Sequence, residues 1–493
     1  MKREDGKPSQ GRKAIAIAGV RGGMGKTVVT LGLIRSLCRK KYSVAPFKKG
    51  PDYIDPAWLS LAAGRYCHNL DTFLMDDQTT RSIYESNHPD TRLCVLEGNR
   101  GLYDGYNVDG THSFAELSKL LDVPVILVVD CTKASRTVAA LVLGVKMFDP
   151  DLRIRGVILN NLAGERHRAL ITEAVQKYTG LPVLGSVPRI PGMLPRERHL
   201  GLVPVFEHEG PEALIESLAD IIEKSLDLER IIEIAGAGPP EGTMPSMNFK
   251  AAIDPLGECI TCASTADTAP PEAPLIGVLR DSAFNFYYRE NIEALVSAGG
   301  RIVEISPLSD HTLPDVDGLY VGGGFPETHA ESLSNNRSFR EQLRRRIEDG
   351  LPVYAECGGL IYLSDSIIID GNNYPMTRVF PMMFDIAASP QGHGYTVFEV
   401  DGDNPFYDRG DIVKGHEFRY ARIQNSEGLD GLSTVFAMRR GTGIKGRRDG
   451  ALYKNVVATF CHTHAAGENV RWPERLVGLA GKRIKAEAKS NGK

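Results

Sequence analysis

Short apolar runs alternate with amphipathic stretches from residue 13 to about Ile234. The runs are rich in β-branched residues and too short for helices, so they predict strands. We expect these strands at Ala14–Ala18, Ser43–Phe47, Leu93–Leu96, Val125–Val129, Gly156–Leu159 and Val183–Ser186. The stretches between them predict helices, for example Thr27–Arg39, which carries Leu33 and Leu37 on one side. This alternation is typical of a parallel sheet covered by helices on both faces.

The alternation stops and then resumes. Residues 236–273 are rich in Pro, Gly and Ala and show little periodicity, which predicts a linker. Beyond it we expect strands at Leu275–Leu279, Arg301–Ile305, Gly318–Val321 and Leu351–Tyr354. We therefore predict two α/β domains, and the full division is a polar extension (1–12), a first domain (13–235), the linker (236–273), a second domain (274–480) and a basic tail (481–493).

Composition narrows the function classes. The chain of 493 residues is 42% hydrophobic and 24% charged, as in ordinary globular proteins. Its formal charge of -4 argues against nucleic acid as the main partner. No apolar run approaches the roughly 20 residues that cross a bilayer, and no apolar signal core follows Met1–Lys13, so we expect a cytoplasmic protein without a membrane partner. The only CxxC, Cys259 and Cys262, lacks two further ligands at zinc spacing, and we interpret it as incidental.

A glycine loop, Gly19-Val-Arg-Gly-Gly-Met-Gly-Lys-Thr27, follows the first predicted strand and opens a helix. Such a loop exposes backbone N–H groups to phosphates, and its lysine and threonine would reach the β/γ-phosphates and Mg²⁺. The spacing is one residue longer than the usual pattern, and the alternative is a glycine-rich turn with no ligand. We expect ATP and Mg²⁺ as cofactors. The predicted nucleotide-binding residues are Gly22, Gly23, Gly25, Lys26, Thr27 and Asn160.

Two acidic segments, Lys48–Pro56 and Glu97–Gly105, also follow predicted strands. Open α/β sheets bind ligands at the carboxyl ends of their strands, and magnesium prefers carboxylate oxygens. Taken singly, an aspartate in a turn is usually only a turn or cap residue. Together with the glycine loop, however, the two segments outline an ATP–Mg²⁺ site with acidic groups left over for a substrate.

A second candidate site centres on Cys357, in Ala355-Glu-Cys-Gly-Gly359 directly after a predicted strand. Small residues permit a sharp turn with free N–H groups, as a cysteine nucleophile requires. His462 or His464 is the candidate base, and the alternative is an inert buried thiol. The candidate donors to an oxyanion or to glutamine are Gly323, Gly324 and Gly358.

Several long motifs together resemble the cobyrinic acid a,c-diamide synthase family, and the resemblance covers nearly the whole chain except 236–274. The motifs are the glycine loop, Phe47–Pro56, Glu97–Gly105, Glu197–Leu202, Asp281–Tyr288, Gly322–Glu327, Ala355–Gly359 and Lys414–Phe418.

The resemblance implies a P-loop domain of the dethiobiotin-synthetase type followed by a class I glutamine amidotransferase domain. It implies that Cys357 hydrolyses glutamine through a thioester and that ammonia reaches the first domain. There ATP would phosphorylate the a- and c-side-chain carboxylates of a tetrapyrrole, and ammonia would displace phosphate. The implied partners are glutamine and the tetrapyrrole, cobyrinate in cobalamin biosynthesis, and a homodimer is a further expectation. By position we expect Thr27, Asp52 and Glu97 near the metal and Tyr53, Asp55 and Asp104 near the substrate.

The chain departs from the ordinary class I amidotransferase pattern at one place, as the cobyrinic and cobyric subfamilies do, and from the usual corrin-enzyme pattern at two. His464 stands where ordinary class I amidotransferases carry a glutamate, which favours a Cys357–His462 dyad over a triad. Asn99-Arg100 and the stretch Pro390–Tyr395 are similar to relatives that amidate sirohydrochlorin or sirohaem for sulfite reductase. The alternative substrates are therefore sirohydrochlorin, its nickel form and sirohaem.

Two other functions compete. The loop Arg21–Thr27 resembles that of partitioning ATPases, with Arg21 at their signature lysine position. The appended cysteine domain and the acidic balance argue against such a switch, and glutaminase activity would separate the two. A glutaminase with an inactive synthetase domain is the third hypothesis, and the intact loop and carboxylates argue against it.

Overall fold

The computed structural model describes residues 13–89, 92–190, 203–240, 272–424, 429 and 431–491. The chain forms two compact units: unit 1 is Met1–Thr72 with Asp77–Asp254, and unit 2 is Phe73–Asp76 with Pro255–Lys493. Four sequence features lie wholly or mostly outside the described residues: the extension 1–12, the motif Glu197–Leu202, the cysteine pair and the linker. The domain limits given above stay predictions.

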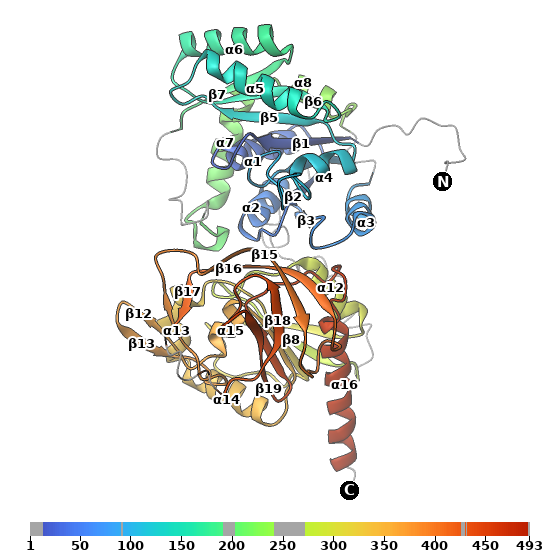
Figure 1. Cartoon of the computed structure of the whole chain (residues 1–493), viewed down its shortest axis with the longest axis vertical. Helices are drawn as coiled ribbons and strands as arrows, with labels where there is room; N and C mark the ends of the chain where they lie inside the picture. The colour runs from blue at the N-terminus through green and yellow to red at the C-terminus, as the bar shows by residue number, and fades with distance from the viewer. Residues whose placement is uncertain are drawn as a thin grey trace, which may run out of the picture. The chain divides into compact units, whose positions relative to one another are not determined.

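Unit 1 contains one sheet of seven parallel strands in the order β3-β2-β4-β1-β5-β6-β7 (Figure 1). The strands are β1 (Ala14–Gly19), β2 (Val44–Lys49), β3 (His68–Leu70), β4 (Leu93–Glu97), β5 (Val125–Asp130), β6 (Ile154–Leu162) and β7 (Val183–Pro188). The expected parallel sheet is confirmed.

Helices cover both faces of this sheet. Alternate strand residues point to opposite faces, so Ile15 and Ile17 pack under α1, α2, α7 and α8, while Ala14 and Ala16 face α3, α4, α5 and α6. The helices are α1 (Lys26–Arg39), α2 (Ile54–Ala63), α3 (Asp77–Asn87), α4 (Phe114–Leu120), α5 (Arg136–Phe148), α6 (Glu165–Thr179), α7 (Pro211–Ser225) and α8 (Leu228–Ile234), with the short η1 (Val205–Glu207).

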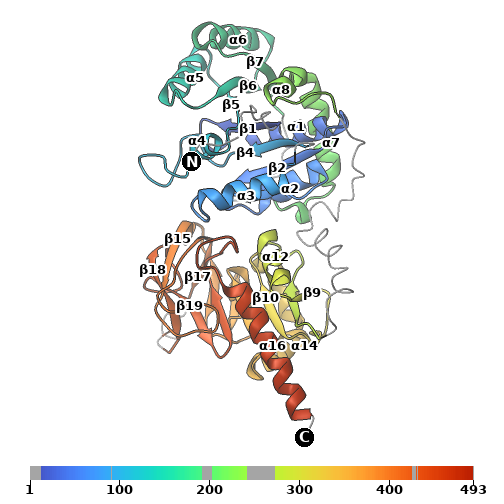
Figure 2. The same cartoon turned by 90° about the vertical axis from the view of Figure 1, so that its right-hand side faces the viewer.

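Unit 2 is built on a nine-stranded mixed sheet in the order β16-β15-β18-β19-β20-β11-β10-β8-β9, with a smaller sheet β13-β12-β14-β17 (Figure 2). The strands are β8 (Leu275–Leu279), β9 (Arg301–Ile305), β10 (Gly318–Val321), β11 (Val353–Glu356), β12 (Ser366–Ile369), β13 (Asn372–Pro375), β14 (Met383–Ile386), β15 (Gly392–Val400), β16 (Ile412–Arg419), β17 (Ala421–Ile423), β18 (Thr434–Arg440), β19 (Arg448–Tyr453) and β20 (Val456–Thr459). From β9 to β20 the neighbouring strands are parallel, which confirms the second α/β domain.

The helices of unit 2 also lie on both faces of its large sheet. Residues of α13, α14 and α15 pack on one face and residues of α12 and α16 on the other. The helices are α12 (Arg289–Ser297), α13 (Ala330–Asn335), α14 (Arg337–Glu348), α15 (Gly358–Tyr362) and α16 (Trp472–Asn491), with the short η2 (Pro326–His329). Helix α16 continues through most of the segment expected to be a tail.

The strand order brings each candidate site together. In unit 1, β1 lies beside β4 and β4 lies beside β2, so the loops that follow these strands meet at one edge. In unit 2, β10, β11 and β20 are neighbours, so Gly322, Cys357 and His462 follow adjacent strand ends. Both arrangements agree with the rule that open α/β sheets bind ligands at strand carboxyl ends.

Candidate functional site

The phosphate loop of unit 1 connects β1 to α1. Gly23 and Gly25 have φ values of 71° and 80°, which glycine adopts without strain. A Cβ on Gly25 would also collide with the side-chain amide of Asn160. The Nδ2 atom of Asn160 donates to the carbonyl of Met24 over 2.9 Å. The structure therefore places Asn160 against the loop, where it holds the backbone that a phosphate would contact.

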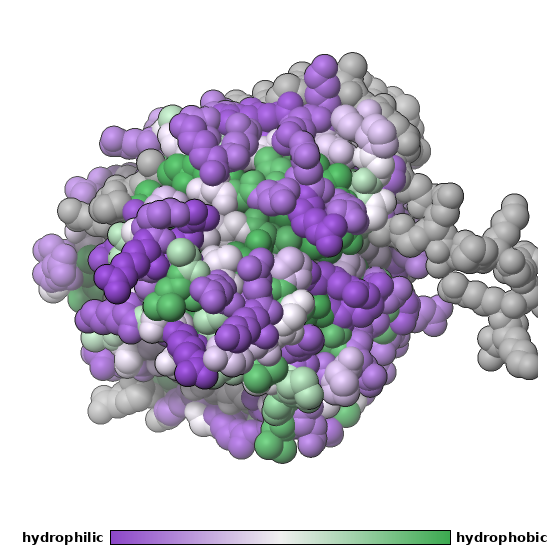
Figure 3. Space-filling view, turned by 90° about the horizontal axis from the view of Figure 1, so that it is seen from above, coloured by the Kyte–Doolittle hydropathy of each residue, from purple (hydrophilic) through white to green (hydrophobic). Residues whose placement is uncertain are grey.

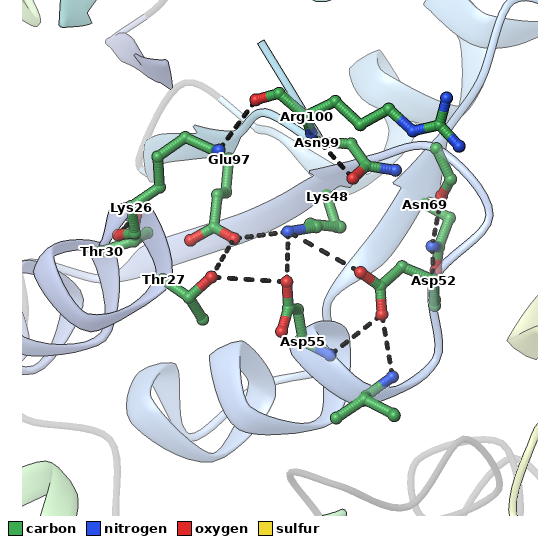
Figure 4. Close-up of polar contacts among 12 residues, drawn as sticks. Lys26, Thr27, Thr30, Lys48, Asp52, Asp55, Asn69, Glu97, Asn99 and Arg100 are labelled. Carbon is green, nitrogen blue, oxygen red and sulfur yellow. Dashed lines mark hydrogen bonds and ion pairs between the residues drawn. The ribbon is translucent and has the colours of Figure 1, made fainter. Parts of the chain in front are cut away.

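Lys26, the first residue of α1, is 7% exposed and donates from Nζ to the carbonyl oxygen of Arg100 over 2.8 Å (Figure 4). Burial lowers the pKa of Lys26, and nearby Glu97 only partly offsets this effect. A phosphate group at the loop would offer this lysine an anionic partner in place of a neutral carbonyl. The position suits the expected contact with the β/γ-phosphates.

Thr27 lies beside two carboxylates. Its hydroxyl donates to Oε1 of Glu97 over 3.0 Å and lies 3.4 Å from Oδ2 of Asp55. Glu97 is fully buried, and its second oxygen, Oε2, has no hydrogen-bond partner among the described residues. A buried carboxylate oxygen without a partner is costly, so these residues fit a divalent cation. The described residues contain no group of three Asp, Glu, His or Cys side chains that could hold a metal ion by itself, so phosphate oxygens and water would complete the coordination.

Lys48 is a central residue of this site that sequence reasoning missed. Its side chain is 2% exposed, and Nζ lies 2.5 Å from Asp55, 2.5 Å from Glu97 and 3.8 Å from Asp52 (Figure 4). Burial alone would lower the pKa of Lys48, but the carboxylates outweigh it and hold that pKa well above its usual value. The signal in the sequence was the pair of lysines that ends the fully buried strand β2.

We expect Lys48→Met to destabilise unit 1 by roughly 3–5 kcal/mol, because it leaves buried carboxylates without their cation. Mg²⁺ should restore part of the loss by replacing the missing positive charge. Denaturant unfolding with and without Mg²⁺ measures both effects, and Lys224→Met, at an exposed position on α7, is the matched control. An unchanged midpoint in Lys48→Met would contradict the role of Lys48 as the counter-charge.

The other predicted residues of unit 1 lie around this cluster. Asp52 accepts the backbone N–H groups of Ile54 and Asp55 at the start of α2. Burial and the Asp55 carboxylate raise the pKa of Asp52 to about 7, although Lys48 acts in the opposite direction. Tyr53 stands at the N-cap position of α2, and Asp104 accepts the N–H of Gly101 over 2.8 Å. The geometry thus places Asp55 nearer to Thr27 than Asp52, and the assignment of metal and substrate ligands stays a prediction.

Cys357 of unit 2 occupies a strained turn between β11 and α15. Its φ of 47° and ψ of -98° lie outside the regions favoured by a residue with a side chain. A Cβ on Gly359 would lie 2.5 Å from the carbonyl of Val321, so the helix that follows needs glycine there. The thiol donates to the carbonyl of Phe418 over 3.8 Å. This strand–turn–helix arrangement is the one expected for a nucleophile on an elbow.

His462 and the glycine triplet border the same turn. A Cβ on Gly323 would collide with the imidazole of His462, and a Cβ on Gly358 would lie 3.0 Å from the nitrogen of Gly324. The three predicted donors and the predicted base are therefore adjacent. Burial lowers the pKa of His462 to about 3, which keeps the imidazole neutral.

His464 lies in a different environment, 3.4 Å from Glu290 and with its ring 4.7 Å from that of Tyr288. The partner that sequence reasoning missed is His416: its ring stacks on His462 at 4.8 Å, and the two backbones exchange both hydrogen bonds. His416 comes from β16, more than forty residues away, and only the motif Lys414–Phe418 pointed to that segment. The geometry agrees with His462 as the base.

Two charged residues of opposite sign act on the Cys357 thiol. Burial and the carboxylate of Glu327 raise the pKa of Cys357 to about 12, whereas the guanidinium of Arg419 lowers it. Arg419 is 7% exposed, lies 4.0 Å above the ring of Phe460, and donates to two carbonyls and to no carboxylate among the described residues. A buried cation of this kind favours an anion nearby, and the thiolate is such an anion.

Opposite changes in Cys357 reactivity should follow when these charges are removed. Arg419→Gln should raise the pKa of the thiol and slow its alkylation by iodoacetamide. Glu327→Gln should lower that pKa and speed the alkylation. Each rate should change several-fold, since one pKa unit changes the thiolate fraction about tenfold. The rate is measured from pH 6 to pH 10 on Cys357 by peptide mass spectrometry. Arg422→Gln, at an exposed guanidinium, is the control. Changes of the same sign in both variants would contradict this electrostatic account.

Residues 15–197 match the family described as "CobQ/CobB/MinD/ParA nucleotide binding domain", and residues 275–470 match "CobB/CobQ-like glutamine amidotransferase domain". A protein of Magnetococcus marinus named cobyrinate a,c-diamide synthase is 38% identical over 92% of this chain and 94% of its own length. Proteins of the same name from Archaeoglobus fulgidus and Methanosarcina acetivorans are 38% and 37% identical, each over 91% of this chain and 94% and 92% of their lengths. Within the part of the chain that is described, none of the helices is long and apolar enough to span a membrane.

Proposed function

Because the chain belongs to the cobyrinate a,c-diamide synthase family, we propose that it amidates the a- and c-side-chain carboxylates of a tetrapyrrole, with cobyrinic acid as the first candidate. The enzyme class is a glutamine-dependent amide-forming ligase. ATP with Mg²⁺ and glutamine are the proposed cosubstrates. The structural observation that carries the proposal is that one chain holds both a cysteine elbow and a P-loop lysine beside a carboxylate cluster.

The glutaminase half-reaction belongs to unit 2. Cys357 attacks the side-chain carbonyl of glutamine, and His462 accepts the thiol proton and passes it to the leaving nitrogen, so that ammonia departs and a thioester remains. Water then cleaves the thioester to glutamate and regenerates the thiol. The backbone N–H groups of Gly324 and Gly358 would stabilise the oxyanion of each tetrahedral intermediate, which their closeness supports.

The synthetase half-reaction belongs to unit 1. A carboxylate oxygen is a poor leaving group, so the carboxylate first takes the γ-phosphoryl group of ATP, which gives an acyl phosphate and ADP. Ammonia then attacks the acyl carbon, and phosphate leaves with the oxygen. Lys26 would bind the β/γ-phosphates, and Thr27, Glu97 and either Asp55 or Asp52 would hold Mg²⁺. When bound, the metal would neutralise charge on the phosphates.

The position of Lys48 supports a site that accepts ATP–Mg²⁺. Its ammonium group lies 2.5 Å from Asp55 and 2.5 Å from Glu97 and supplies a counter-charge to these carboxylates in the buried site. A divalent cation beside Thr27 would compete for the same oxygens. Lys48 would then be released toward Asp52, which lies 3.8 Å away, or toward an anionic substrate carboxylate.

Two residues of the loop after β4 support a second candidate for the tetrapyrrole substrate, beside cobyrinic acid. Asn99 and Arg100 differ from the two apolar residues usual in the corrin enzymes, and Figure 4 shows the Arg100 side chain extending away from Lys26. A guanidinium at this loop adds a positive charge that an acidic macrocycle would meet. Sirohydrochlorin, its nickel form and sirohaem are therefore the second candidates, with the same amidation chemistry.

Mass spectrometry of the products tests the proposal. The protein is incubated with ATP, Mg²⁺ and glutamine and, separately, with cobyrinic acid, sirohydrochlorin, nickel sirohydrochlorin or sirohaem. Two amidations of cobyrinic acid are expected. Amidation of a sirohydrochlorin derivative alone would select the alternative, and no amidated product from any of the four would overturn the tetrapyrrole proposal. Absence of glutamine hydrolysis would instead favour a switch ATPase.

The remaining partners follow from the same reaction. ATP and glutamine are cytoplasmic metabolites, so we place the reaction in the cytoplasm. A second copy of the chain is the further partner we propose.

A further inference from the structure

Helix α5 has an outer face without polar side chains over its last two and a half turns. Its buried side consists of Val138, Ala139, Val142 and Val145. The opposite side is exposed and consists of Ala140, Leu141, Leu143, Gly144, Met147 and Phe148. A surface helix normally carries polar residues on its outer face, and a helix that is apolar all round is normally covered.

Four large exposed apolar residues lie on α5, and one lies on α6. Phe148 is 75% exposed, Met147 67%, Leu170 51%, Leu141 43% and Leu143 37%. We call these five residues the α5–α6 patch. Figure 3, which views the chain from above Figure 1, shows hydrophobic residues gathered on this face between hydrophilic ones.

The size of the patch suits a protein interface. Fully exposed side chains of this size present roughly 150–250 Å² each, so the five fractions amount to about 500 Å² of apolar surface. That is near the upper end for the largest patch on a monomer, roughly 300–600 Å². A surrounding polar rim would bring it to the roughly 800 Å² that each partner buries in a stable complex.

The charges at the two ends of α5 indicate which partner fits. Lys133 and Arg136 are exposed at its amino end, and Asp151 is exposed just beyond its carboxyl end. In a two-fold interface both copies use the same surface. Two antiparallel α5 helices would therefore place Arg136 of each copy near Asp151 of the other. A Cβ on Gly144 would meet nothing within 4 Å, so its backbone can be approached closely.

We propose that the α5–α6 patch is the two-fold interface of a homodimer, in which α5 packs antiparallel against α5 of a second copy. The mixed charges around the patch disfavour an anionic membrane or nucleic acid, because both need a predominantly basic rim. This inference rests on the homodimer proposed above and not on the amidation chemistry. The inference is tested by the molecular mass of the protein in solution, so a failure of the dimer interface is distinguishable from a loss of amidation activity.

Sedimentation velocity of the full chain over a wide concentration range tests the interface. The wild type is expected to be a dimer. The double variant Leu143→Glu/Met147→Glu places two carboxylates of each copy, four in all, in or near an apolar contact. It is expected to weaken dimerisation at least tenfold. The matched control is Phe206→Glu, at an apolar residue of η1 that is 48% exposed outside the patch. A monomeric wild type, or a double variant that dimerises like the control, would overturn the proposal.

A charge exchange tests the antiparallel geometry without touching apolar residues. Arg136→Glu and Asp151→Arg should each weaken the dimer, and the double variant should recover most of the lost affinity, because it restores opposite charges across the two-fold axis. Additive weakening in the double variant would overturn the antiparallel packing. Binding of the wild type to phosphatidylglycerol vesicles, lost in Met147→Glu, would show a lipid surface as the occupant and would also overturn the homodimer interface.

Discussion

Cys357→Ser is expected to abolish glutamine-dependent amidation and to leave amidation with high ammonium largely intact. Serine keeps the shape of the elbow, but its hydroxyl is far less acidic than a thiol and is the weaker nucleophile in this site. Removal of a catalytic nucleophile lowers turnover by several orders of magnitude in hydrolases that use one, so we expect a loss of at least about 10³-fold in glutaminase activity.

The ammonium-dependent rate is the decisive part of this measurement. Unit 1 holds the phosphate loop and its carboxylates and needs only free ammonia to form the amide. Cys38→Ser is the matched control, because Cys38 is a buried thiol on α1 whose replacement removes no part of either site. If both nitrogen sources fail together in a folded Cys357→Ser protein, the division of the reaction between two sites is wrong.

The sequence predicted the fold where a strand had an apolar run of its own. The runs at Ala14–Ala18 and Val125–Val129 became β1 and β5, each one residue longer. Strand β3 was missed because His68-Asn69-Leu70 contains no apolar run. It is a strand because it pairs with β2. The run at Leu351–Tyr354 was placed two residues early, since the buried β11 continues through Glu356 to the turn at Cys357.

In the candidate sites, too, local features could be predicted and features that depend on strand pairing could not. The phosphate loop and the cysteine elbow are local features, because glycines at fixed spacing determine the backbone. Lys48, His416 and Arg419 could not be predicted from local pattern, because their roles depend on strands that pair far apart in sequence. A lysine that ends an apolar strand was the only available signal, and its partners Asp55 and Glu97 became visible only when β2 and β4 lay side by side.

This dependence on pairing explains why the metal ligands were harder to predict than the nucleophile. Asp52 and Asp55 belong to one short segment, and either could have faced Thr27. The start of α2 decides between them, because Asp52 uses its carboxylate to accept two backbone N–H groups of the helix. Asp55, the second residue of the helix, is then directed toward Thr27 and Lys48.

Lys26→Ala is expected to remove amide formation with both nitrogen sources while glutamine hydrolysis continues. Activation of the carboxylate precedes attack by ammonia, so a protein that cannot stabilise the transferring phosphoryl group makes no product from either source. Lys26 is buried, donates to the carbonyl of Arg100 and would supply a positive charge to the phosphates, whereas Lys48 is held by Asp55 and Glu97. We expect a loss of at least about 10²-fold in product, measured by mass spectrometry, with Lys224→Ala as the control and glutaminase activity as the test of folding. Product formation that persists undiminished in Lys26→Ala would contradict the assignment of ATP to this loop.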